Sequence, residues 1–260
     1  MHTVGIGGWL ILGCSLAAVC QSVPQKLVSG PPTLLHEHSP LPAQEVARRL
    51  QERNAQRFAS LDQFSGTRVY HMKYRGFPSD RDADMVVNVT YQAPNEKDFK
   101  IVSQTGSKFI IDHVFKKLLE SEQQDTDEEN RQHTALSTDN YDFTSAGYEV
   151  TPDGAEYVLN IFPKNKNKFL YRGKIWVDAK DFAVVRIEAE PAKNPSLWIK
   201  TTQIQHRYIK VQDFWLPAEN HTESVIRLGG QASLSIEYKD YKITKATPLR
   251  ALHSMRENPK

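Results

Sequence analysis

The chain has 260 residues and a formal net charge of +2, and no segment concentrates its basic residues. This balance excludes nucleic acid as the main partner, because phosphate backbones are bound by concentrated basic surfaces. Aromatic residues make up 10% of a chain that is polar on average, so we expect them to be buried or to line a cavity.

The first 22 residues are a candidate export signal. Residues 4–19 form an uncharged apolar run, too short to cross a bilayer, which takes about 20 apolar residues. Cys20-Gln21-Ser22-Val23-Pro24 then resembles a cleavage site, although no Lys or Arg precedes the run. A membrane anchor is the alternative, and Ile11-Leu12-Gly13-Cys14 is similar to a lipobox, so acylation at Cys14 or Cys20 stays open.

Cysteine usage limits the chemistry of the remaining chain. Cys14 and Cys20 are its two cysteines, and both lie in the candidate signal. A mature chain starting near Val23 would form no disulfide and would have neither a thiol nucleophile nor a cysteine-based zinc site.

Residues 23–41 are rich in Pro and Ser without periodicity and predict a flexible tether. A helix is expected from Pro42, a residue that suits the first turn. Its apolar residues recur at helical spacing and predict an amphipathic helix that covers a sheet: Val46, Ala47, Leu50, Phe58 and Leu61.

From Phe64 onward the apolar period changes to two, which predicts strands over residues 67–74, 85–91 and 99–104. A second helix is predicted over residues 107–122, because six residues form a wide apolar stripe: Ile110, Ile111, Val114, Phe115, Leu118 and Leu119. Further antiparallel strands are predicted over residues 148–150, 156–162, 169–177, 183–190, 199–210, 215–225 and 232–244.

Alternation in these strands predicts one buried and one solvated face. The buried sets are Ile175 with Val177; Val185, Ile187 and Ala189; and Leu234, Ile236 and Tyr238. Trp176 is in phase with the polar residues Lys174 and Asp178, so it is expected on the outer face or under a loop. The predicted fold is α+β and mostly β: a strongly curved antiparallel sheet, an unclosed β-barrel, covering two helices over residues 42–246, with a tail at 247–260.

Several stretches resemble a known family: residues 107–120, Asp139-Asn140-Tyr141-Asp142-Phe143, residues 171–178, residues 182–188 and Asp213-Phe214-Trp215-Leu216-Pro217-Ala218. Over residues 42–244 the chain resembles the LolA/LolB-like periplasmic lipoprotein carriers, in the branch labelled outer-membrane lipoprotein-sorting proteins. The resemblance implies a periplasmic, monomeric, non-catalytic carrier that binds a lipid or lipoprotein acyl chain in an apolar cavity. An envelope-stress sensor or interaction protein with a membrane protein partner is the alternative, and a hydrolase is a third.

We expect any ligand on the apolar face of the sheet and its helices. The candidate ligand-binding residues are Ile175, Val177, Val185, Ile187, Leu234, Ile236, Ile111, Phe115, Trp198 and Trp215.

The sequence predicts no catalytic residue, no metal site and no cofactor. It contains no G-x-S-x-G, H-E-x-x-H or glycine-rich phosphate loop. His36-Glu37-His38 falls in the tether, where a metal site would lack rigid support. His206 and Asp213 are too isolated in the sequence to predict a dyad.

Overall fold

The computed structural model describes residues 40–124, 133–152, 154–166, 169–194, 196–227 and 229–245. The candidate export signal, almost all of the predicted tether and the C-terminal tail lie outside these residues, and so does His36-Glu37-His38.

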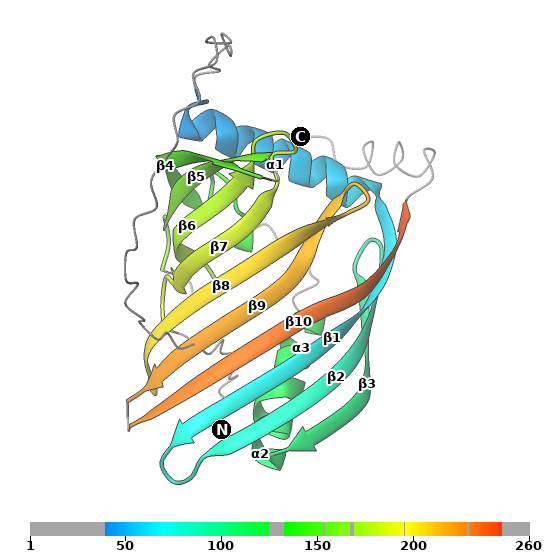
Figure 1. The fold of residues 1–260 in the computed structure, drawn as a ribbon, viewed down its shortest axis with the longest axis vertical. Coiled ribbons are helices and arrows are strands. Elements are labelled where there is room, and N and C mark those ends of the chain that lie inside the picture. Colours follow the sequence, from blue (N-terminus) through cyan, green and yellow to red (C-terminus); the bar gives the residue numbers. More distant parts are fainter. Residues whose placement is uncertain are drawn as a thin grey trace, which may run out of the picture.

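The described residues form one ten-stranded sheet in which every neighbouring pair is antiparallel (Figure 1). The strands are β1 (Leu61–Gly76), β2 (Arg81–Gln92), β3 (Glu96–Gly106), β4 (Tyr141–Thr151), β5 (Gly154–Pro163), β6 (Tyr171–Asp178), β7 (Val184–Pro191), β8 (Ile199–Val211), β9 (Phe214–Ile226) and β10 (Gly230–Lys245). Their order is β3-β2-β1-β10-β9-β8-β7-β6-β5-β4, so β1 pairs with β10 in mid-sheet and β3 and β4 are the edges. The predicted curved, unclosed antiparallel sheet is therefore confirmed.

The main error in the predicted strands concerns β4, which was expected only over residues 148–150. The strand begins at Tyr141, where Tyr141 and Phe143 alternate inward. Residues 144–150 are exposed, because β4 is an edge strand. A strand that buries two side chains gives little periodic signal.

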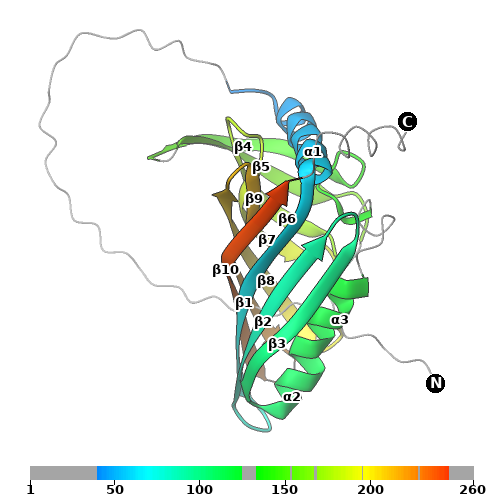
Figure 2. The same ribbon diagram turned by 90° about the vertical axis from the view of Figure 1, so that its right-hand side faces the viewer.

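Two helical segments lie against the sheet (Figure 2). The first is the predicted helix, α1 (Ala43–Ser60), and Val46, Ala47 and Leu50 are buried, whereas Leu61, expected in the helix, begins β1. Phe58, which was assigned to the same apolar face, is exposed. Residues 51–56, which precede it, are exposed as well, and Arg57 donates to the carbonyl oxygen of Phe182 at 3.3 Å.

The second segment is the predicted helix over residues 107–122. It consists of α2 (Lys108–Ile110), a π-helical turn η1 (Ile111–Phe115) and α3 (Lys116–Gln124). Among the described ranges, no helix has both the length and the apolar character needed to cross a membrane.

The two helical segments organise two separate hydrophobic cores. The first core packs α1 against β4, β5, β6 and β7, with Leu50, Ile161 and Ile175 fully buried. The second core packs the α2–η1–α3 segment against β1, β2 and β10, with Met85 and Phe115 fully buried. Each helical segment packs on its own end of the concave side, so neither core includes the buried residues of β8 and β9, in the middle of the sheet.

A β-bulge corrects the predicted face of β7. Trp176 pairs with Arg186 and Val177 with Val184, so Val185 has no partner of its own across the ladder. Val184 therefore joins the first core in place of Val185, which is half-buried. Trp176 is buried, with the guanidinium of Arg186 3.6 Å from its ring centroid.

Candidate functional site

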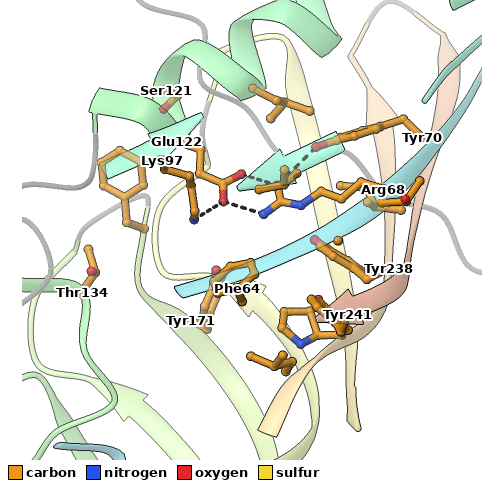
Figure 3. A pocket seen from close by; sticks show the side chains of 18 residues that line it. Phe64, Arg68, Tyr70, Lys97, Ser121, Glu122, Thr134, Tyr171, Tyr238 and Tyr241 are labelled. Carbon is orange, nitrogen blue, oxygen red and sulfur yellow. Dashed lines mark hydrogen bonds and ion pairs between the residues drawn. The ribbon is translucent and has the colours of Figure 1, made fainter. Parts of the chain in front are cut away.

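A cavity of about 480 Å³ lies on the concave side, between the two cores (Figure 3). It borders the second core through Tyr70, Val89 and Ile236, and the first through Tyr171. Strands β1, β6, β9 and β10 and helix α3 supply most of its wall. Its lining residues are Phe64, Gly66, Thr67, Arg68, Tyr70, Val89, Lys97, Leu118, Ser121, Glu122, Thr134, Phe169, Tyr171, Leu216, Pro217, Ile236, Tyr238 and Tyr241.

Much of the wall is apolar or aromatic. Phe64 stacks on Tyr91, with ring centroids 5.3 Å apart, and meets Tyr241 edge-on at 6.1 Å. Tyr241 donates from its hydroxyl to the carbonyl oxygen of Pro217 at 2.9 Å. These contacts fix the orientation of the rings, so this part of the wall is preformed.

The tyrosine hydroxyls of the wall stay neutral in ordinary buffers. Burial raises the pKa values of Tyr70, Tyr171, Tyr238 and Tyr241. Neutral hydroxyls can accept or donate a hydrogen bond without adding charge to the cavity.

A three-membered charged cluster forms one side of the cavity, as Figure 3 shows. Arg68 of β1 donates two hydrogen bonds to the carboxylate of Glu122 on α3, at 2.6 and 2.9 Å. Lys97 of β3 donates to the same carboxylate at 2.6 Å. The Arg68 guanidinium also lies over the rings of Phe99 and Tyr238, at 5.4 and 5.1 Å from their centroids. This cluster therefore ties α3 to the sheet across the cavity.

The electrostatics of this cluster make Glu122 unsuited to proton transfer. Burial alone would raise the pKa of the carboxyl group, but the hydrogen bonds and charge of Arg68, with those of Lys97, outweigh it and hold the pKa at about 2. A general acid or base needs a pKa near the working pH. The carboxylate that lines the cavity acts as a structural anion.

Among the residues predicted to bind a ligand, Ile236 lines this cavity. The others on the concave side are buried in the cores: Ile111, Phe115 and Leu234 in the second, and Ile175, Val177 and Ile187 in the first. They do not line the cavity.

Three predicted residues lie elsewhere. Val185 and Trp215 line a separate pocket of about 410 Å³ that also contains Arg186 and Arg207. The indole nitrogen of Trp215 donates to Asp181 at 2.9 Å. Trp198 is exposed in the loop before β8.

Sequence reasoning missed Arg68, Lys97 and Glu122. One signal was available, because Arg68 shares its parity in β1 with Tyr70 and Met72, which are both buried. A charged residue on an apolar face implies a buried partner. The partner lies 54 residues away, and the sequence did not identify it.

The other candidate chemistry does not assemble in the described part of the chain. No group of three or more His, Cys, Asp or Glu residues there could hold a metal ion. Asp213 forms its ion pair with Lys245, whereas His206 is half-buried, with its ring centroid 6.2 Å from that of Tyr171.

No family model and no curated protein matches this chain. Solved structures similar to it include a DUF1329 family protein from Desulfovibrio piger (12% identity, 82% of this chain, 98% of the other, TM-score 0.39). An outer membrane lipoprotein-sorting protein domain from Vibrio parahaemolyticus is similar at 12% identity, with 83% and 98% covered and a TM-score of 0.37. A LolA superfamily protein from Nitrosomonas europaea is similar at 12% identity, with 80% and 96% covered and a TM-score of 0.33.

These values are too low for any residue role or activity to be carried over, and the fold described above rests on the strand pairings of this chain. Two of the similar structures bear the same family labels as the sequence resemblance.

Proposed function

We propose that this protein binds an alkyl or acyl chain of a lipid or lipoprotein in the cavity between its two cores, and carries it without catalysis. The observation that supports the proposal is the cavity itself, about 480 Å³ with a largely apolar and aromatic wall in the middle of the concave side. This volume lies within the range of roughly 300 to 1,000 Å³ typical of sites for small ligands.

The energetic reason for such a carrier is the cost of exposing an alkyl chain to water. Each exposed CH₂ costs about 0.8 kcal/mol, so a ~14-carbon chain costs roughly 10 kcal/mol. A cavity walled by Leu118, Leu216 and Ile236 can replace this water with apolar contacts. Transfer then requires only binding and release.

The charged cluster supports a non-catalytic role. The Glu122 carboxylate is held ionised by Arg68 and Lys97, and the tyrosine hydroxyls of the wall are held neutral by burial. We also propose that the protein is exported to the periplasm, with or without acylation of Cys14 or Cys20.

The first test is native mass spectrometry of the purified protein followed by lipid extraction. Stoichiometric lipid or a captured lipoprotein supports the proposal. Capture of a membrane protein in the absence of lipid would support the sensor alternative, and turnover on a panel of ester and glycan substrates would support a hydrolase.

The second test fills the cavity. Ser121→Trp and Thr134→Trp each place an indole on the cavity wall, whereas Glu120→Trp adds the same group at an exposed position of α3. The affinity for a fluorescent fatty acid should fall in the first two variants and stay unchanged in the third. Equal binding by all three variants would contradict the assignment of this cavity.

A further inference from the structure

Four large apolar side chains are exposed at the end of the sheet opposite α1. Leu197 is 88% exposed, Phe77 78%, Trp198 62% and Phe109 53%. Phe77 lies in the β1–β2 turn, Phe109 in α2, and the other two in the β7–β8 loop, at the lower end of the molecule in Figure 1. Isolated exposed apolar residues are ordinary, but four at one end of the molecule, three in loops and one in α2, require an explanation.

Two hydrogen bonds and one cation–π contact connect these elements into one surface. The backbone N–H of Arg227, in the β9–β10 turn, donates to the carbonyl oxygen of Trp198 at 2.8 Å. On the other side of that turn, the N–H of Phe77 donates to Gly229 at 3.5 Å. Arg81 lies 4.9 Å above the ring of Phe109. We call Phe77, Phe109, Leu197 and Trp198, together with these connecting turns, the basal surface.

The β7–β8 loop has a defined conformation that points its apolar residues outward. Asn194 donates from its side chain to the carbonyl oxygens of Ile199 and Lys200, at 3.4 and 3.3 Å. The N–H of Trp198 donates to the hydroxyl of Ser196 at 3.3 Å. The exposure of Trp198 is therefore built into the loop.

The basal surface also carries excess positive charge. Lys193 and Arg227 lie in its loops and Lys200 lies at the start of β8, and no other described side chain forms an ion pair with any of them. The carboxylates nearby have cationic partners, because Asp80 and Asp82 share Arg75, at 3.6 and 2.8 Å. Asp112 binds Lys108 at 3.1 Å.

We infer that the basal surface docks on the headgroup region of a lipid bilayer that contains anionic lipids. Trp and Phe side chains favour the boundary between headgroups and acyl chains, and basic residues near them gain from the negative surface potential. A second copy of this chain fits less well, because docking two basal surfaces would bring unpaired cations together. This inference stands independently of what the cavity holds.

The experiment is co-sedimentation of the purified protein with vesicles of phosphatidylcholine, alone or with about 30% phosphatidylglycerol, at ~0.05 and ~0.5 M NaCl. We expect binding to the anionic vesicles that weakens at the higher salt concentration. The emission of Trp198 should shift to the blue on binding, because its indole leaves water.

The variant that tests the surface is Leu197→Ser/Trp198→Ser, which should weaken vesicle binding about tenfold or more. Its control is Val150→Ser at the opposite end, where Val150 is 81% exposed in the β4 edge strand. Arg227→Glu/Lys200→Glu should remove the preference for anionic vesicles. All of these variants keep the same amino-terminal segment, so differences among them report on the substituted sites.

Equal vesicle binding by wild type and Leu197→Ser/Trp198→Ser, or an equal loss in Val150→Ser, would overturn the inference. Self-association that this double substitution abolishes, without vesicle binding, would assign the surface to a second copy of the chain. The affinity for the fluorescent fatty acid should be unchanged in every one of these variants. A loss of vesicle binding is therefore distinguishable from a loss of ligand binding in the cavity.

Discussion

Replacing Glu122 with Gln isolates the contribution of the charged cluster. The substitution keeps the size of the side chain but leaves the buried guanidinium of Arg68 beside Lys97 without an anion. Removing one partner of a fully buried ion pair costs about 3 to 5 kcal/mol. The Glu122 side chain is 35% exposed, so water reduces the loss. Arg68 also keeps its contacts with the rings of Phe99 and Tyr238. We therefore expect a loss of about 2 to 3 kcal/mol in the free energy of unfolding.

Urea unfolding followed by circular dichroism measures this loss. The matched control is Glu120→Gln, which removes an exposed ion pair with Lys117 on the same helix, 2.6 Å in length. That pair should contribute less than about 0.5 kcal/mol. Arg68→Met/Glu122→Leu should recover much of the loss, because it leaves no unpaired charge. Equal destabilisation by the Glu122 and Glu120 variants would mean that the charged cluster contributes no more to stability than an exposed ion pair does.

Three further predictions concern pH, backbone conformation and packing. Burial lowers the pKa of His206 from 6.5 to about 4. The unfolded chain therefore takes up this proton at a higher pH than the folded protein does, so the free energy of unfolding falls as the pH drops from 6.5 toward 4. At pH 5 this group should cost about 2 kcal/mol relative to pH 7, and the pH dependence of urea midpoints should shrink accordingly in His206→Gln. Gly106 has a φ of +89°, and an added Cβ would lie 2.3 Å from a backbone oxygen, whereas Gly229, with a φ of +81°, has open space around it. Gly106→Ala should cost clearly more in thermal stability than the ~1 to 2 kcal/mol expected for Gly229→Ala, and equal costs would argue against the close approach. Phe115→Ala should cost about 3 to 5 kcal/mol because Phe115 is fully buried in the second core, and Phe109→Ala should cost under about 1 kcal/mol in the same unfolding assay.

The fold was predictable where one face of a strand or helix is consistently buried. β2 shows this most clearly, since Ala83, Met85, Val87, Val89 and Tyr91 are buried in strict alternation. Such a pattern fixes both the type of element and the face that packs inward. The curved sheet and its two helical segments follow from repeating this argument along the chain.

The predictions failed where a local irregularity interrupts the period. The β-bulge in β7 exchanges Val184 and Val185 between faces, and valine at both positions gives no indication of which is inside. Similarly, the π-helical turn at Ile111–Phe115 lies within a normal helical stripe. These features depend on tertiary pairing.

The candidate site was predictable only in outline. Alternation identified the concave face, but it could not separate residues that fill a core, such as Ile175 and Leu234, from a residue that borders a cavity, such as Ile236. The difference depends on how far each helix extends over the sheet. Arg68 and Glu122 meet only because β1 and α3 face each other across that space.

The most direct test of a chain-binding cavity is a crystal structure of the protein with a fatty acid brominated along its chain. We expect anomalous bromine peaks inside the cavity, between Leu118 of α3 and Tyr238 of β10. Absence of bromine there, with the protein's own side chains occupying the space, would contradict this expectation.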